Sequence, residues 1–290
     1  MKSLVEAART LLILGRVSNL PTVWSNLLAG WFLAGGGNDR TALVPLLLGG
    51  SFLYVGGMFL NDFCDADFDS QYCPERPIPV GRISRRSVGG MAGLWLVAGL
   101  ACLVPFGWPT VGIALLLLAI IVLYDFRHKN VFWAPLVMGA CRFLLYPLAA
   151  STISAEIPSF VLLWGATLGL YVAGITYLAR GESRPEKPAR WALLLLLLPV
   201  AAPVEIYYVR NLQFFPFLFS CLLFLGWMAW LLIPLWRKTN HSIGRVISGL
   251  LAGIVLVDFI VTSLVLGFEA AYLLLFFVLA LLLQGIIPAT

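Results

Sequence analysis

Long apolar segments alternate with short polar ones along most of this chain. The apolar segments lie at residues 10–36, 41–60, 88–106, 109–124, 132–151, 158–179, 190–207, 213–235, 244–267 and 268–288. A helix needs about 20 apolar residues to cross the hydrocarbon core of a bilayer. Two of the segments, 109–124 and 190–207, are short for a span. The pattern therefore predicts an all-α fold, a polytopic transmembrane helical bundle of nine or ten spans.

Composition supports this prediction and excludes an ordinary soluble domain. The 290 residues are 61% hydrophobic and only 11% charged. We expect a single membrane domain over residues 1–290. The five cysteines show no paired spacing, so neither a disulfide framework nor a zinc site is indicated. Arg16 and Asn19 interrupt the first apolar segment and no small-residue cleavage site follows, so we expect it to be retained as a span.

The basic residues predict how the bundle is oriented. Fifteen of the 19 lysines and arginines fall before the first segment or after an even-numbered one, whereas only Arg40 and Arg210 fall on the opposite side. Such a bias over short loops places the N-terminus and the even-numbered loops in the cytoplasm, as expected for a multi-pass integral membrane protein. The net charge of +5 is dispersed among these loops. The bilayer is therefore the expected partner, and nucleic acid is not.

The densest chemistry in the sequence lies directly after the second apolar segment. Residues 61–82 read N-D-F-C-D-A-D-F-D-S-Q-Y-C-P-E-R-P-I-P-V-G-R and hold five of the 14 acidic residues. On a helix, Asp65 lies about 60° and Asp69 about 20° from Asp62, whereas Asp67 points about 140° away. Asn61 lies at the rim of the same face. Crowded oxygen ligands suit a hard cation. We therefore expect this face to be a Mg²⁺–diphosphate site, in which the candidate ligands of the metal are Asn61, Asp62, Asp65 and Asp69.

Two other interpretations of the acidic segment compete with this one. A solvated acidic face beside a membrane helix is the simpler of them, but it does not require the i, i+3, i+7 spacing. The D-x-D-x-D sequence also resembles the start of an EF-hand loop, which needs Gly at its sixth position and Glu at its twelfth. Ser70 and Arg76 stand there instead, so the calcium interpretation fails.

A rigid turn, R-P-I-P-V-G-R, follows the acidic segment. Its prolines end the helix and keep Arg76 and Arg82 near the acidic face, where guanidinium groups suit phosphate oxygens. The alternative is that these arginines only mark the cytoplasmic side.

Polar residues inside the apolar segments are further candidates. Asn19 and Asn26 are seven residues apart and share a helix face, so they either line a pocket or form interhelical hydrogen bonds. Arg142 lies well inside the fifth segment and requires an anionic partner. Asp258 is either a functional acid or half of a structural ion pair, with Arg142 or Arg16 as its partner.

The motif N-D-F-C-D-A-D-F-D followed by R-P-I-P-V-G-R-I-S resembles the first aspartate-rich motif of the UbiA superfamily of intramembrane prenyltransferases. The family pattern N-D-x-x-D-x-x-x-D matches Asn61, Asp62, Asp65 and Asp69. The resemblance implies a nine-helix, Mg²⁺-dependent enzyme that moves a prenyl group from a polyprenyl diphosphate to an acceptor. The segment Y-D-F-R-H-K-N, from Tyr124, is similar to a family element after the fourth helix. It makes Arg127 and Lys129 candidate diphosphate contacts.

The chain departs from the family pattern after the sixth apolar segment. The family has a second aspartate motif there, whereas this chain reads T-Y-L-A-R-G-E-S-R-P-E-K-P, a form that resembles the divergent EboC-like branch. Tyr177, Arg180, Glu182 and Arg184 are its candidate residues. Either the arginines replace the second metal, or the chemistry is lost and the fold binds or transports a lipid.

The expected assignments fall into four groups. The residues expected to act in catalysis are Asp62, Asp65, Lys129 and Glu182. Those expected to bind diphosphate are Asn61, Arg76, Arg82, Arg127, Lys129, Arg180 and Arg184. Those expected to line the pocket are Asn19, Asn26, Arg142, Tyr124 and Tyr177. The expected metal ligands are Asn61, Asp62, Asp65 and Asp69. The acceptor stays open between an aromatic compound (a phenolic acid or quinone precursor), a tetrapyrrole, and a sugar or cyclitol phosphate.

Overall fold

The structure, a computed structural model, describes residues 2–37, 40–127, 131–180, 191–201, 213–236 and 243–288. Within these ranges the chain forms helices and turns and no β-strand. The α-helices are α1 (Lys2–Leu14), α2 (Leu20–Leu33), α3 (Leu43–Tyr72), α4 (Arg85–Leu103), α5 (Trp108–Arg127), α6 (Ala134–Phe143), α7 (Leu145–Ala150), α8 (Ser159–Arg180), α9 (Ala192–Ala201), α11 (Phe214–Trp236), α12 (Ile243–Ala252), α13 (Ile254–Leu266) and α14 (Leu273–Gln284). Short 3₁₀ helices are η1 (Val17–Asn19), η2 (Val104–Phe106) and η4 (Gly267–Tyr272).

Six helical stretches of the described residues are long and apolar enough to cross a membrane. They are Leu43–Tyr72, Arg85–Phe106, Trp108–Arg127, Ser159–Arg180, Phe214–Ile233 and Ile243–Gln284. Two shorter apolar helical stretches, Ala134–Ala150 and Ala192–Ala201, accompany them. The all-helical class expected from the sequence is therefore correct for the described part of the chain, and the count of nine or ten spans stays a prediction.

Two apolar segments, the first and the fifth, form broken helices in the structure. The first is divided at Gly15 and Arg16, between α1 and η1. The fifth is divided at Leu144, between α6 and α7. Pro147 explains the second break, because it has no N–H to donate to the carbonyl of Phe143. These breaks matter because Arg16 and Arg142 lie at or beside them.

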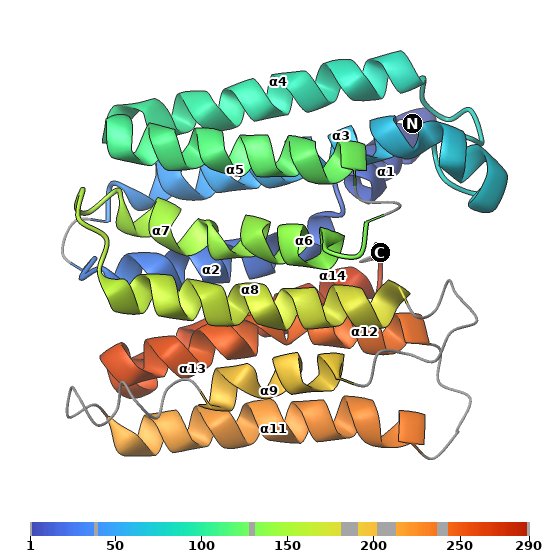
Figure 1. The fold of residues 1–290 in the computed structure, drawn as a ribbon. Coiled ribbons are helices and arrows are strands. Elements are labelled where there is room, and N and C mark those ends of the chain that lie inside the picture. The colour runs from blue at the N-terminus through green and yellow to red at the C-terminus, as the bar shows by residue number, and fades with distance from the viewer. Residues whose placement is uncertain are drawn as a thin grey trace.

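The helices run alongside one another in a layered bundle (Figure 1). The helix α3 packs along α4, α6 packs against α8, and α2 packs against α7. The α6–α8 contact is close because both helices have glycine at the crossing: a Cβ added to Gly139 would lie 2.3 Å from the Gly169 carbonyl oxygen. Because of this close approach, α6 and α8 pack tightly against each other inside the bundle.

One end of the bundle gathers the polar segments. The acidic end of α3, the first turns of α4 and α6 and the last turns of α5 and α8 all lie at the right-hand end in Figure 1. The N-terminal helix α1 reaches the same end. The interior below this end is apolar, formed by large clusters that include Trp164, Leu168 and Leu53. The fold thus places a charged rim over a hydrophobic interior.

Candidate active site at the polar end of α3

The four motif residues of α3 are buried although they are polar. Asn61, Asp62, Asp65 and Asp69 have relative exposures between 3% and 7%. The Asp67 side chain is 83% exposed and faces away, where its carboxylate pairs with Arg85 at 3.0 Å. The buried face of α3 therefore holds Asp62, Asp65 and Asp69, and the exposed face holds Asp67, as the helical spacing predicts. Buried carboxylates need compensating charge or hydrogen bonds, so their partners define the site.

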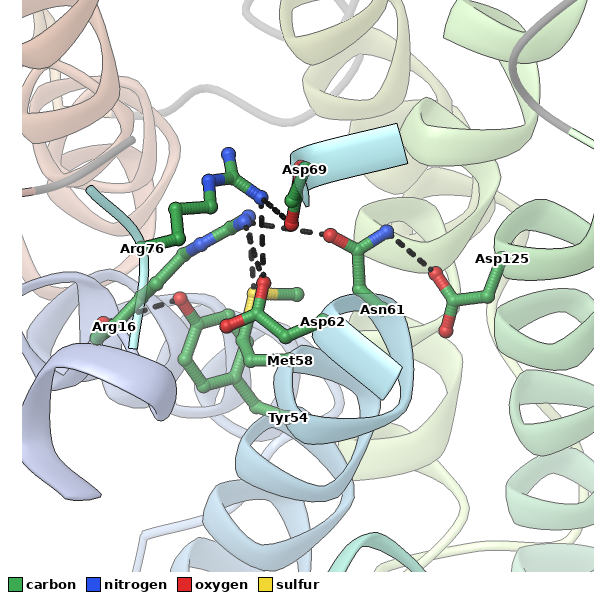
Figure 2. Close-up of polar contacts among 8 residues, drawn as sticks. All are labelled: Arg16, Tyr54, Met58, Asn61, Asp62, Asp69, Arg76 and Asp125. Carbon is green, nitrogen blue, oxygen red and sulfur yellow. Dashed lines mark hydrogen bonds and ion pairs between the residues drawn. The ribbon is translucent and has the colours of Figure 1, made fainter. Parts of the chain in front are cut away.

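Two guanidinium groups meet the carboxylates of α3 (Figure 2). Arg76 Nη1 lies 2.9 Å from Asp69 Oδ2 and 3.5 Å from Asp62 Oδ1. Arg16 Nη2 lies 3.4 Å from Asp62 Oδ1 and donates to Asn61 Oδ1 at 3.3 Å. Burial disfavours the charged form of Arg76, but the carboxylates of Asp69 and Asp62 outweigh it and raise the Arg76 pKa above its ordinary value. Arg76 therefore stays a cation bridging two carboxylates.

The turn after α3 explains how Arg76 reaches back to the helix. The helix ends at Tyr72, and Pro74 and Pro77 cannot continue its hydrogen-bond ladder. The backbone N–H of Arg76 donates to the Cys73 carbonyl, which tightens the turn. The turn thus directs the Arg76 side chain back to the acidic face of α3.

Arg16 corrects an expectation from the sequence. It was one of the two expected partners of Asp258, and it instead contacts Asp62 on α3. Its backbone has φ 41° and ψ 47°, the left-handed region. Among the described residues it is the one non-glycine residue with positive φ. This conformation costs about 1–2 kcal/mol. It lies in the turn between α1 and η1, from which the guanidinium reaches α3.

Asp125 joins the site from α5, although sequence reasoning assigned no clear role to it. Its Oδ1 accepts a hydrogen bond from Asn61 Nδ2 at 3.1 Å (Figure 2). Asp125 is buried, with 6% relative exposure. The signals in the sequence were its place at the polar end of an apolar segment and its position next to Tyr124 in the segment Y-D-F-R-H-K-N.

A cavity of about 470 Å³ connects this charged cluster to the interior. Its polar lining includes Arg16, Asn19, Asn61, Asp65, Arg76, Tyr124, Asp125, Arg142 and Arg180. Its apolar lining includes Leu53, Leu117, Ile121, Leu145, Val172, Ile175, Ile247 and Leu251. An amphipathic ligand with an anionic head and an apolar tail matches this division of the walls.

A second polar network lies deeper, beside the cavity. Arg142, which lines the cavity, donates from Nη1 to Asn26 Oδ1 at 2.9 Å, and Asn26 Nδ2 donates to Asp258 Oδ2 at 2.7 Å. The carboxyl group of Asp258 also accepts hydrogen bonds from Ser25 and from the Tyr146 hydroxyl group. Asn26 is not among the residues that line the cavity. Its role in the structure is therefore the interhelical hydrogen bond, the second of the two interpretations of the sequence, whereas Asn19 does line the cavity.

The remaining candidates from the sequence divide into four groups. Tyr124 and Arg180 line the cavity, and Arg180 donates to the Val131 carbonyl at 2.8 Å. Tyr177 and Arg82 do not line it. The Tyr177 hydroxyl group donates to the Phe132 carbonyl, and Arg82 is exposed in the turn after α3. Arg127 is exposed and borders a second cavity of about 410 Å³. Lys129, Glu182 and Arg184 lie outside the described residues.

The residues of the site fit a divalent cation that is bound together with a substrate. Among the described residues, no three histidine, cysteine or acidic side chains converge into a complete metal site. Mg²⁺ does not need one, because it typically takes one or two carboxylates and completes its coordination with water and phosphate oxygens. The Arg76 guanidinium between Asp62 and Asp69 shows that these two carboxylates already share one cation. The donor set therefore suits Mg²⁺ accompanied by a diphosphate.

Comparisons with known proteins show relatives of this chain by sequence and by fold. The chain is 27% identical to the 4-hydroxybenzoate octaprenyltransferase of Photobacterium profundum over 144 residues, which is 49% of this chain and 50% of that one. The chain thus matches about half the length of such curated relatives. The fold is similar to that of a UbiA homolog from Aeropyrum pernix K1, with a TM-score of 0.68, 18% identity, and coverage of 84% of this chain and 96% of that one.

A second solved structure with this fold is a UbiA homolog from Archaeoglobus fulgidus bound to GPP and Mg²⁺. It has a TM-score of 0.61 and 16% identity, and the match covers 89% of this chain and 99% of that chain. A model of the UbiA prenyltransferase family matches residues 21–253, which include α3 to α8 and the acidic face of α3. The chain therefore belongs to the UbiA prenyltransferase family.

Proposed function

We propose that this protein is a Mg²⁺-dependent prenyltransferase that moves a prenyl group from a polyprenyl diphosphate to an acceptor within the membrane. The observation that carries the proposal is the continuity of the charged cluster on α3 with an apolar cavity. The relatives support it, because a similar protein is named 4-hydroxybenzoate octaprenyltransferase and a structural neighbour is bound to GPP and Mg²⁺.

The proposed reaction is an electrophilic substitution at the first carbon of the prenyl chain. The C–O bond breaks, diphosphate leaves with the electron pair, and the acceptor's nucleophilic atom bonds to the carbon and then loses a proton. When bound, Mg²⁺ acts as a Lewis acid toward the leaving diphosphate. Asn61, Asp62, Asp65 and Asp69 would hold it.

The chain's own residues supply the rest of the stabilisation. Arg16 and Arg76 place two positive charges where phosphate oxygens would arrive, and Arg180 adds a third on the cavity wall. Fixed charges of this kind lower the cost of the negative charge that develops as the C–O bond breaks. The apolar walls exclude water, which would otherwise capture the allylic cation.

The test of this proposal is product formation by the purified protein. With geranylgeranyl diphosphate and Mg²⁺, we expect diphosphate release that depends on an acceptor, with 4-hydroxybenzoate and a host lipid extract as the first acceptors to try. Mass spectrometry should find the prenylated acceptor, and chelation of Mg²⁺ should stop its formation. Binding of the diphosphate without release under all acceptors would instead favour a lipid-binding or transport role.

We also propose the topology predicted from the sequence, nine or ten spans with the N-terminus and the acidic end of α3 in the cytoplasm. The gathering of Arg76, Arg82, Arg85, Arg127 and Arg180 at one end of the bundle supports it. In a variant without its five native cysteines, Glu156→Cys and Arg82→Cys would be probed with an impermeant maleimide. In right-side-out vesicles, Glu156→Cys should be labelled and Arg82→Cys protected. The reverse result would invert the orientation.

A further inference from the structure

The Asn61 amide is held from both sides, and this decides which of its atoms faces the proposed metal site. Its Oδ1 accepts from Arg16 Nη2 at 3.3 Å, and its Nδ2 donates to Asp125 Oδ1 at 3.1 Å. A flipped amide would place its NH₂ group against a guanidinium and its oxygen against a carboxylate, so both hydrogen bonds would be lost. The two neighbours thus select one orientation.

We propose that Asp125 is a positioning residue of the metal site, which turns the Asn61 oxygen toward the cation by accepting a hydrogen bond from the Asn61 amide nitrogen. The inference rests on the proposed function, because it presumes that a divalent cation binds at the α3 face. Only the oxygen of an amide can bind Mg²⁺. The orientation of Asn61 therefore determines whether it is a ligand.

Arg16 cannot fix this orientation alone once a cation is present. Its guanidinium contacts Asn61 Oδ1, the same atom that a metal needs. A cation at the α3 face competes with Arg16 for this oxygen, whereas the hydrogen bond to Asp125 uses the opposite atom of the amide. Asp125 is thus the partner whose contact is compatible with metal binding (Figure 2).

The surroundings of Asp125 suit this role. It is buried at the polar end of α5, and α5 packs against α3, so two helix backbones set the distance to Asn61. Asp125 and Asp65 border both the main cavity and the second cavity of about 410 Å³. A hydrogen bond to a charged acceptor is also about twice as strong as one between neutral groups. Such supporting partners typically change metal affinity about 10- to 100-fold.

The experiment is a double-mutant cycle with Mn²⁺ affinity as the measurement, read by electron paramagnetic resonance on the full-length protein in detergent. A saturating non-reactive analogue, geranylgeranyl S-thiolodiphosphate, is present to supply the phosphate oxygens that complete the coordination. We expect Asp125→Ala to weaken Mn²⁺ binding about 10- to 100-fold in the wild-type background. In an Asn61→Asp background the loss should shrink to less than about threefold or become a gain, because a carboxylate has no wrong orientation and repels Asp125. Equal losses in both backgrounds would overturn the proposal, since they would mean that Asp125 acts by charge or as a ligand itself.

A second variant keeps the test decisive if Asp125→Ala folds poorly. Asp125→Asn keeps the shape and an acceptor oxygen for Asn61, so it should lose less Mn²⁺ affinity than Asp125→Ala. Asp67→Asn, on the exposed face of α3, is the matched control and should bind Mn²⁺ as the wild type does. Wild-type protein that binds no Mn²⁺ would refute the proposed function as well, whereas wild-type binding with an additive cycle would refute only the role of Asp125.

Discussion

Replacing Asp62 with alanine is expected to lower kcat/KM for prenyl transfer by about 10²- to 10³-fold, the scale seen when one preorganised electrostatic group is lost. Asp62 is the carboxylate that both guanidinium groups share, at 3.4 Å from Arg16 and 3.5 Å from Arg76. Its removal takes a candidate metal ligand from the site. It also leaves Arg16 without its carboxylate. The lost ligand weakens the hold on Mg²⁺, and Arg16 is no longer positioned by a carboxylate, so the loss should appear in kcat as well as in KM.

The matched control is Asp67→Ala, an identical change five residues along the same helix. The Asp67 side chain is exposed and pairs with Arg85 at the surface, a contact worth little. Steady-state kinetics over a Mg²⁺ titration should separate the two variants, with Asp67→Ala close to the wild type. Equal losses of kcat/KM in both variants would contradict the assignment of the buried face as the site. An unchanged kcat/KM in Asp62→Ala would show that Asp62 does not take part in the reaction.

The sequence predicted those parts of the site that depend on the period of one helix. Asn61, Asp62, Asp65 and Asp69 share a face because of their spacing, and Asp67 lies opposite for the same reason. The apolar segments likewise predicted the helical class. Both inferences use local geometry, which the backbone imposes whatever the rest of the chain does.

Contacts between distant segments were not predictable in this way. Arg16 lies 46 residues before Asp62, and Asp125 lies 64 residues after Asn61. Their pairing depends on how α1, α3 and α5 pack, and no spacing rule encodes that packing. The left-handed backbone of Arg16 was also hidden, because non-glycine residues rarely adopt it.

Tyr177 shows where a local argument was taken too far. It was expected in the pocket as a residue of the segment T-Y-L-A-R-G-E, in which Thr176 and Arg180 do line the cavity. Thr176 and Arg180 are four residues apart and share a face of α8, whereas Tyr177 is turned about 100° from Thr176. Its ring packs instead against Phe132 and Trp191. The angular positions of residues on α8 would have shown that Tyr177 does not share the face of Thr176 and Arg180.

Replacing Asp258 with alanine is expected to destabilise the protein by roughly 3–5 kcal/mol, the cost of removing one partner from a buried charged network. Asp258 is fully buried and accepts hydrogen bonds from Ser25, Asn26 and Tyr146. Without it, Asn26 and Tyr146 lose this acceptor, Ser25 keeps only the Thr22 carbonyl, and Asn26 no longer links Arg142 to a carboxyl group. Thermal unfolding in detergent should show the loss as a lower Tm.

The control is Glu269→Ala, an exposed acid on η4, which should leave the Tm unchanged. Arg142→Met, added to Asp258→Ala, tests the cause of the loss. If the stranded guanidinium is what destabilises the single variant, the double variant should recover part of the Tm, because an apolar side chain is tolerated where an uncompensated charge is not. An Asp258→Ala protein as stable as Glu269→Ala would show that the network does not stabilise the bundle. Asp258 would then have to be retained for another reason, such as setting the charge of Arg142 at the cavity wall.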